Sequence, residues 1–198
     1  SDDPVLRNPV AVAHARLVVT GADGARLHEE VIAAGGELRE GRFARMNVGQ
    51  TAAALAAASD RAPSESTQRS LGDHFPRHRE ALRAALEARM GERVDGLRRR
   101  LDERRDREIA DLTSVLGELR EGILAALREP ENEQLTFSFS AGQREQYQRD
   151  LTSLRRRADA IPAEIAHETE AIRRRFAGPV PRLFPVAITY LVPRTLAG

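Results

Sequence analysis

The chain has 198 residues, of which 41% are hydrophobic and 31% charged, and its formal net charge at pH 7 is only +1. A nearly neutral chain has no global field to attract nucleic acid, so contacts with phosphates must come from local arginine clusters, since lysine is absent. The lack of cysteine excludes disulfides and thiolate metal sites, and no apolar run approaches the roughly 20 residues that span a bilayer, so we expect a cytoplasmic protein without membrane contact.

The N-terminal part of the sequence predicts a β-hairpin followed by a small helix. Residues 12–20 are rich in β-branched side chains, and the turn residues 21–24 lead into a second strand over residues 25–32. Gly35 and Gly36 are expected to break the chain, with a short extended segment over residues 37–46. The alanine-rich residues 51–59 behind Asn47 predict a short helix, and residues 62–67 a linker or a helix start.

Two long amphipathic patterns occupy most of the remaining chain. Apolar residues recur at steps of three and four over residues 77–128, and again over residues 143–176. The first helix would reach roughly 75 Å and would need a partner along its length. We therefore predict that the second helix runs back antiparallel to the first along a shared apolar seam. Pro76 is expected to mark the start of the first helix or a kink, and Pro162 to bend the second.

Two strands are predicted on either side of the second helix. Residues 134–140 alternate between apolar and polar, and the nearly continuous apolar run at residues 184–192 indicates a strand buried on both faces. The predicted fold class is α+β, mainly helical, with a small sheet from the N-terminal hairpin and the C-terminal strand and a long antiparallel coiled-coil arm. The corresponding segments are residues 1–76, 77–177 and 178–198.

The sequence holds no pattern typical of a catalytic centre. The phosphate-binding patterns GxxxxGK[ST] and GxGxxG are both absent, as are HExxH and GxSxG. His74 and His78 are four residues apart, but they flank Pro76 and lack a suitable third ligand. We therefore expect no catalytic residue, no metal site and no cofactor in this chain.

Arginine clusters are the strongest candidates for a binding surface. If the helices pair around the connection at residues 130–142, positions whose numbers sum to about 270 lie opposite each other. Arg173 would then lie within about a turn of Arg98, and the combined patch could neutralise phosphates. The candidate DNA-binding residues are Arg98, Arg99, Arg100, Arg104, Arg105, Arg173, Arg174 and Arg175.

A second interpretation assigns the same arginines a structural role. The register that sums to about 270 also brings Glu170 near Arg100, and Glu164 near Arg105 and Arg107, where they could form interhelical ion pairs. Residues 102–108, which include no apolar side chain, distinguish the two interpretations. Arginines that point into solvent there are available for binding, whereas arginines paired with acids across the seam are structural.

Several stretches resemble a known family. Residues 133–138 (EQLTFS), 143–157 (QREQYQRDLTSLRRR) and 182–193 (RLFPVAITYLVP) look like the C-terminal end of bacterial SWI/SNF-like helicases of the DrmD type, which belong to DISARM antiphage defence systems. Residues 16–32 (RLVVTGADGARLHEEVI) are similar to the segment that follows the motor. The resemblance implies a parent ATP-dependent helicase that moves on double-stranded DNA. Its ATP and magnesium would be bound by motor lobes that lie outside this sequence.

The resemblance implies a non-catalytic accessory domain that positions DNA or a partner relative to the motor. The expected partners are the motor lobes of the parent helicase, double-stranded DNA or another subunit of the defence system. The alternative function is a structural protein–protein interaction arm with no direct DNA contact. Since the sequence starts with Ser1 and not methionine, we expect it to be a piece of a longer polypeptide.

Overall fold

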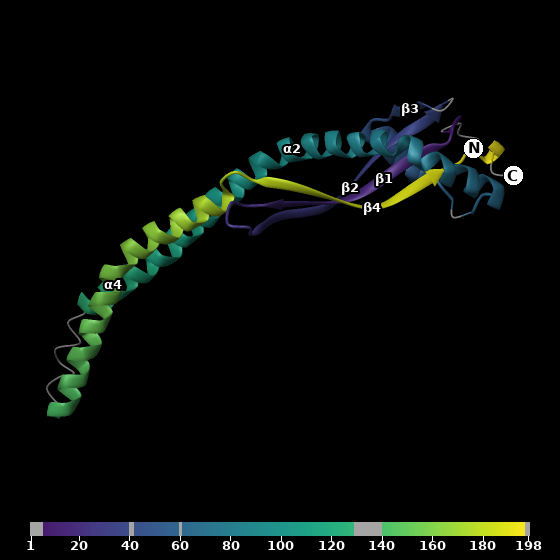
Figure 1. The fold of residues 1–198 in the computed structure, drawn as a ribbon. Helices are drawn as coiled ribbons and strands as arrows, with labels where there is room; N and C mark the ends of the chain where they lie inside the picture. Colours follow the sequence, from purple (N-terminus) through teal and green to yellow (C-terminus); the bar gives the residue numbers. More distant parts are fainter. Residues whose placement is uncertain (1–5, 40–41, 60, 129–139, 197–198) are drawn as a thin grey trace. The chain divides into compact units, whose positions relative to one another are not determined.

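The computed structural model describes residues 6–39, 42–59, 61–128 and 140–196. Its elements follow in the order β1 (Val10–Thr20), β2 (Arg26–Arg39), β3 (Arg42–Arg45), α1 (Val48–Ala56), α2 (Glu65–Arg128), α4 (Ala141–Phe176), β4 (Val180–Leu191) and a 3-10 turn at Arg194–Leu196 (Figure 1). The predicted α+β, mainly helical class is confirmed. The chain divides into two compact units, which are described separately: residues 1–99 with 178–198, and residues 100–177.

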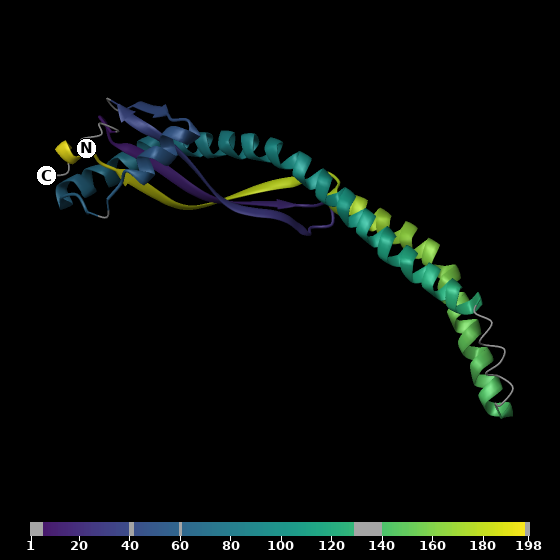
Figure 2. The ribbon, with the colours of Figure 1, turned by 180° about the vertical axis from the view of Figure 1, so that it is seen from behind.

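The first unit is built on a four-stranded antiparallel sheet in the order β3-β2-β1-β4. The central strand β1 pairs along its whole length with β4, from Val10 opposite Leu191 to Thr20 opposite Val180. Figures 1 and 2 show the N-terminal and C-terminal strands side by side from opposite directions. The expectation that both terminal segments join one sheet is confirmed.

Gly35 and Gly36 lie inside β2, so the prediction that they break the chain is wrong. The surroundings of Gly36 leave no room for a side chain, and those of Gly35 are tight. A Cβ on Gly36 would lie 2.4 Å from the Phe43 ring and 2.7 Å from the carbonyl oxygen of Ala44, and one on Gly35 would lie 3.1 Å from Val12 Cγ2. The glycines therefore permit close packing within a continuous strand.

Residues 65–99 of α2 cover one face of the sheet. The face is identified by Glu30, which lies opposite Leu17 in the β1–β2 ladder and accepts a hydrogen bond of 2.6 Å from Arg93 Nε of α2. Leu17 and Ile32 on this face are 0% and 4% exposed. The α2 side chains buried in this unit are Leu71, His78, Leu82, Ala85, Leu86, Val94 and Leu97.

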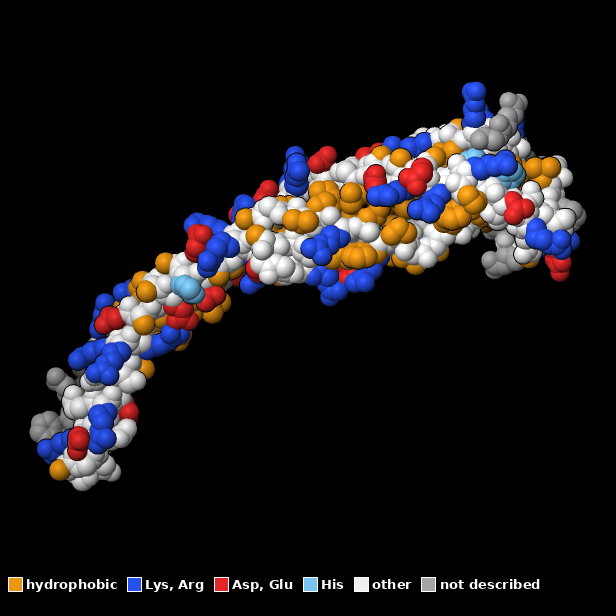
Figure 3. All heavy atoms as spheres, viewed as in Figure 1, with side chains coloured by type: hydrophobic (Ala, Val, Ile, Leu, Met, Phe, Trp, Pro, Cys, Tyr) orange, Lys and Arg blue, Asp and Glu red, His pale blue; other side chains and the backbone are white. Residues whose placement is uncertain are grey.

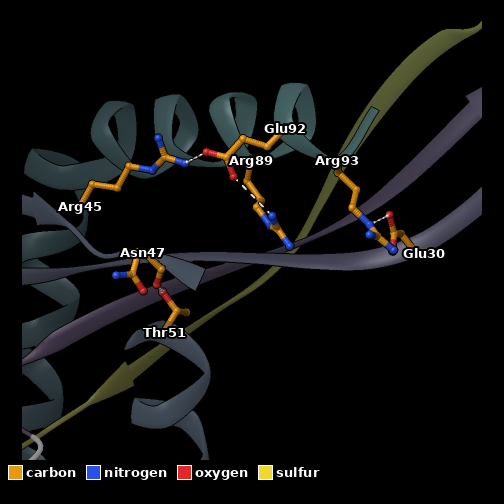
Figure 4. A network of polar contacts seen from close by, with 7 residues as sticks. All are labelled: Glu30, Arg45, Asn47, Thr51, Arg89, Glu92 and Arg93. Atoms are coloured by element: carbon orange, nitrogen blue, oxygen red, sulfur yellow. Dashed lines mark hydrogen bonds and ion pairs between the residues drawn. The ribbon is translucent and has the colours of Figure 1, made fainter. Parts of the chain in front are cut away.

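Ion pairs connect α2 to the edge of this face, as Figure 4 shows. Arg45 of β3 donates to Glu92 over 2.8 Å, and Arg89 donates to the other oxygen of Glu92 over 3.3 Å. The hydrogen bond from Arg45 lowers the pKa of Glu92, as the hydrogen bond from Arg93 lowers that of Glu30. Ion pairs near the surface are weak because water screens them, so these pairs orient the helix while apolar burial holds it.

The opposite face of the sheet carries α1 at only one end. Asn47 caps this helix by accepting a hydrogen bond of 2.8 Å from the backbone N–H of Gln50, whose side chain accepts in return from Asn47. Ala54 packs with Val10, Val12 and Leu191 in a small core. Beyond this core no described helix covers the open face, where Val31 is 70% exposed.

The long helix begins at Glu65, twelve residues before the predicted start at Arg77, and Pro76 lies in its interior. A proline clashes with the carbonyl four residues earlier, which here belongs to Gly72, a residue whose backbone yields most easily. Leu71 and His78, on either side of Pro76, are 9% and 3% exposed. Their burial in the first unit stabilises helix on both sides of the proline, which local propensity alone does not predict.

The second unit pairs residues 100–128 of α2 with α4 in opposite directions, as Figures 1 and 2 show and as predicted. Ser140 and Gln143 form a capping box at the start of α4. Ala158, Ile161, Ile172 and Phe176 are at most 8% exposed and mark the buried side of α4. The predicted strand at residues 134–140 lies outside the described residues, except for Ser140, which caps α4.

The prediction that the C-terminal strand is buried on both faces is wrong. β4 is an edge strand, and Phe184, Val186 and Ile188 are 48%, 67% and 37% exposed. A continuous apolar run indicates β structure but contains no information about how many neighbours the strand has. No helix in the described ranges is both long and apolar enough to cross a membrane.

Candidate nucleic-acid interface

The polar segment at residues 102–108 of α2 neutralises most of its own charge. Arg104 donates to Glu108 over 2.9 Å, one turn further along the same helix. Arg105 donates to Asp102 and to Asp106, each over 2.8 Å, and the hydrogen bond to Asp106 raises the pKa of the guanidinium. The contacts with Glu108 and Asp102 follow the spacings of four and three residues that place side chains side by side on a helix, whereas Asp106 is the next residue along the chain.

Contacts between the two helices of the second unit involve few of these charges. Arg175 Nη1 of α4 lies 3.4 Å from Glu108 Oε2, which connects the end of α4 to the polar segment. The guanidinium carbon of Arg104 lies 5.8 Å from the centroid of the Phe176 ring, a cation–π contact that contributes about 0.5–1 kcal/mol at an exposed site. Arg104 and Arg105 therefore match neither of the two expected outcomes: they are paired with acids, but these acids lie on their own helix and not across the seam.

These interhelical contacts correct the predicted register. Glu108 faces Arg175, Arg104 faces Phe176, and Arg120 Nε donates to the Ala158 carbonyl over 3.3 Å. Opposed positions therefore sum to about 280 and not to about 270, a shift of about 15 Å along the helix at 1.5 Å per residue. The prediction assumed that the two helices end level with each other at the connection, whereas the contacts place Arg128, the last residue of α2, opposite about position 152, well after the start of α4 at Ala141.

The corrected register changes the partners expected for two acids. Glu164 pairs with Arg157 of its own helix and not with Arg105, and their closest approach is 2.5 Å. The expected pair between Glu170 and Arg100 is not formed among the described residues. Arg173 instead lines a shallow recess together with Arg105 and Ile109.

The other candidates on α2 belong to two units. Arg98 and Arg99 lie in the first unit and Arg100 in the second, and all three are exposed. Arg98 approaches Asp95 at 3.5 Å in a surface pair. Arg99 and Arg100 have no acidic partner within the described part of the chain.

Two further pairs of exposed arginines lie on α4. Arg173 and Arg174 are exposed in its last turn and form no ion pair with any described residue, whereas Arg175 binds Glu108. Arg155 and Arg156 are also exposed and lack an acidic partner among the described residues. The sequence prediction omitted this second pair from the site. The signal that could have identified it is the spacing between the two pairs, since 18 residues make five turns of a regular helix.

This spacing places Arg155 and Arg173 on one side of α4, and Arg156 and Arg174 beside them. Along a regular helix the two pairs are about 27 Å apart. Asp159 and Glu170 lie on nearby sides of the same stretch and reduce the local charge. Figure 3 shows basic and acidic side chains interleaved along the second unit. The candidate site is therefore a row of two arginine pairs, which we call the α4 arginine row.

His74 and His78 lie near each other on α2, and among the described residues no group of three or more His, Asp or Glu side chains could hold a metal ion. Their ring centroids are 6.3 Å apart, and His78 is 3% exposed. Burial lowers the pKa of His78 because the charged imidazolium loses hydration. His78 therefore contributes to the packing of α2.

Comparisons of the chain with protein-family models, curated proteins and solved structures give no match.

Proposed function

We propose that this chain is a non-catalytic accessory domain whose helical hairpin, formed by residues 100–128 of α2 together with α4, contacts duplex DNA. The contact is made by the α4 arginine row, defined by Arg155, Arg156, Arg173 and Arg174. The observation that supports the proposal is the absence of acidic partners for these four side chains among the described residues, while neighbouring arginines are paired. An arginine that is already paired must lose an acid to gain a phosphate. Unpaired guanidinium groups can bind phosphate oxygens without that cost.

The wider proposal is that the domain belongs to a SWI/SNF-like antiphage helicase and positions DNA or a partner relative to its motor. It is supported by the resemblance of residues 16–32, 133–138, 143–157 and 182–193 to sequences of such helicases. The coding sequence on either side of this segment tests it directly. We expect an ATP-binding loop and an acidic box in the same reading frame, and a frame that encodes neither contradicts the helicase assignment.

DNA binding is tested by fluorescence anisotropy of a labelled duplex at low and moderate salt. The logarithm of the affinity falls against the logarithm of salt concentration with a slope of about −0.9 per neutralised phosphate. Replacing Arg173 and Arg174 together by glutamine is expected to reduce the magnitude of the slope by about two. Unchanged anisotropy in low salt up to tens of micromolar protein contradicts a DNA role.

The matched control removes two arginines that are already paired. Arg104→Gln with Arg105→Gln changes the formal charge equally, but these side chains contact Glu108, Asp102 and Asp106. We expect the control to reduce the salt slope by less than the Arg173 and Arg174 variant does. An equal reduction would mean that only total charge matters and would refute the α4 arginine row as the contact surface.

A second function, a protein–protein interaction arm without DNA contact, is favoured by an apolar strip on the hairpin. Val115 and Leu119, one turn apart on α2, are 64% and 44% exposed. This function would be supported if the sedimentation coefficient of the parent chain rises with concentration, and if that rise disappears in Val115→Glu but persists in Thr113→Glu. Sedimentation as a monomer at all concentrations would exclude self-association through the strip.

A further inference from the structure

The free edge of β4 is a second surface, and it is independent of the arginines on the paired helices α2 and α4. β4 is twelve residues long and ends the sheet, so one of its two rows of backbone N–H and C=O groups has no strand beside it in the described part of the chain. An exposed row of this kind is a template for another strand. The opposite edge, β3, has only four residues, with Arg42 and Arg45 at its ends. A short and charged edge is a common protection against pairing, whereas β4 is longer and carries its protecting features, Pro181, Arg182, Pro185 and a bulge at Val186, in its first part.

The side chains around the β4 edge are apolar and exposed. Val180 and Phe184 are 47% and 48% exposed on the open face of the sheet, Val186 is 67% exposed, and Ile188 is 37% exposed on the face that carries α2. Figure 3 shows hydrophobic side chains gathered over the part of the molecule where β4 runs. An added strand would therefore gain backbone hydrogen bonds and also cover apolar side chains on both faces of the sheet.

Proline restricts pairing to one half of the edge. Pro181 and Pro185 have no N–H and fit a strand where that position points away from the ladder. The ladder shifts between His14 and Ala15 because Val186 is an extra residue in β4. Counting through this bulge, Ile188 continues the series of Pro181 and Pro185, so its N–H points outward. Residues 186–191 therefore offer an outward row that proline does not interrupt.

The charges beside this segment indicate the chemistry of the partner. Between residues 180 and 194 the only charged side chains are Arg182 and Arg194, and both are exposed without an acidic partner among the described residues. A second copy of the chain, paired antiparallel about the middle of residues 186–191, would bring Arg182 of one copy towards Arg194 of the other. The like charges disfavour that pairing, whereas acidic residues at both ends of a strand favour it.

We propose that the free edge of β4 binds an extended strand of another protein, apolar at its centre and acidic at both ends. The strand adds antiparallel or parallel to residues 186–191 and extends the sheet to five strands. Its apolar side chains cover Val186 and Ile188, and its acidic ends pair with Arg182 and Arg194. Recognition rests on backbone hydrogen bonds for affinity and on the terminal charges for specificity.

The test uses the full chain and a fluorescein-labelled peptide of alternating valine and threonine with glutamates at both ends. Saturable anisotropy is expected, together with shifts of the backbone amide resonances of β4. Ile188→Pro removes the outward N–H and is expected to weaken binding at least about tenfold, which corresponds to about 1.4 kcal/mol. The matched variant Ile188→Thr keeps the N–H and is expected to bind within about threefold of the parent chain. The same peptide with lysines at its ends is expected to bind more weakly than the glutamate peptide.

A second measurement does not depend on whether Ile188→Pro folds. N-methylation of alternate peptide amides blocks either the set that faces β4 or the set that faces away, so one methylated peptide is expected to lose binding and the other to retain it. Equal binding of both, or no saturable binding of the unmethylated peptide, overturns the proposal. Dimerisation of the parent chain that Ile188→Pro abolishes, without peptide binding, also overturns it, because the occupant would then be a second copy.

Discussion

Replacing Gly36 by alanine tests whether β2 runs unbroken beneath Phe43. The new Cβ would lie 2.4 Å from Phe43 Cζ and 2.7 Å from the carbonyl oxygen of Ala44. The aromatic ring can turn away, but the carbonyl belongs to the backbone of β3, so the four-residue strand itself must move. Overpacking of this kind costs about 1–3 kcal/mol, and the backbone contact places Gly36→Ala near the middle of that range or above.

Gly91→Ala provides a control for which the expected change in the free energy of unfolding has the opposite sign. Gly91 lies in α2, and a Cβ there would meet nothing within 4 Å. Alanine is favoured over glycine in a helix by about 0.8–1 kcal/mol, so this variant should be more stable than the parent chain. The two substitutions add the same methyl group within the same compact unit, and their free energies of unfolding should differ by about 3 kcal/mol.

Urea unfolding followed by far-ultraviolet circular dichroism measures this difference. With a slope of about 2 kcal/mol per molar urea, the midpoints of the two variants should differ by more than about 1 M, with Gly36→Ala lower. A Gly36→Ala variant as stable as the parent chain would refute the packing of β3 against β2. Destabilisation by Gly91→Ala would refute the helical conformation assigned to that position.

Other predictions concern the hairpin core and the pH dependence of stability. Ile161 is 0% exposed, so Ile161→Ala should lower the free energy of unfolding by about 2–4 kcal/mol. Val115 is exposed, so Val115→Ala should lower it by less than about 0.5 kcal/mol. Urea unfolding measures both changes. Burial lowers the pKa of His78 below its ordinary 6.5, so the folded chain should lose stability as pH falls below 6.5. The midpoint of urea unfolding should fall less over this pH range for His78→Leu than for the parent chain. An equal fall for both would contradict the burial of this ring. The hydrogen bond from Arg93 lowers the pKa of Glu30 below its ordinary 4.5, so its stabilisation is present above pH 4.5 and is lost as pH falls through the folded pKa. Thermal unfolding of Glu30→Gln should therefore show less acid sensitivity than the parent chain, and equal sensitivity would argue against the pair.

The sequence predicted the helices and the joining of the terminal strands because these features depend on local patterns. Steps of three and four residues indicate a helix wherever they persist, and they continue through most of α2 and α4. The early start of α2 was missed because Pro76 is a strong local signal against helix. Burial of His78 and Leu71 in the first unit outweighs that signal.

The burial of β4 and the register of the hairpin depend on information that a local pattern does not carry. An apolar run cannot distinguish a central strand from an edge strand, since both need β-branched side chains. A helix pair with one apolar seam can slide by about two or three turns and keep apolar residues facing each other, so the pattern of apolar residues does not decide the register. The symmetric connection that we assumed gave opposed positions about ten residues from those observed.

The state of each arginine was the least predictable feature. Every candidate has acidic residues within four positions or across the seam, and side-chain geometry decides which contact forms. Arg105 finds two acids on its own helix, whereas Arg174 finds none among the described residues. The signal present in the sequence was the 18-residue spacing of the pairs that begin at Arg155 and Arg173, which equals five helical turns.

The register of α2 and α4 matters most, because it sets which acids lie across the seam from the arginines at the end of α4. The chain has no cysteine, so two introduced cysteines can carry spin labels without a background signal. In double electron–electron resonance, labels at Asp111 and Glu168 should give a clearly shorter distance than labels at Asp111 and Asp159, since nine residues of helix rise about 13.5 Å. A shorter distance for the pair at Asp111 and Asp159 would contradict the register and with it the assignment of the α4 arginine row.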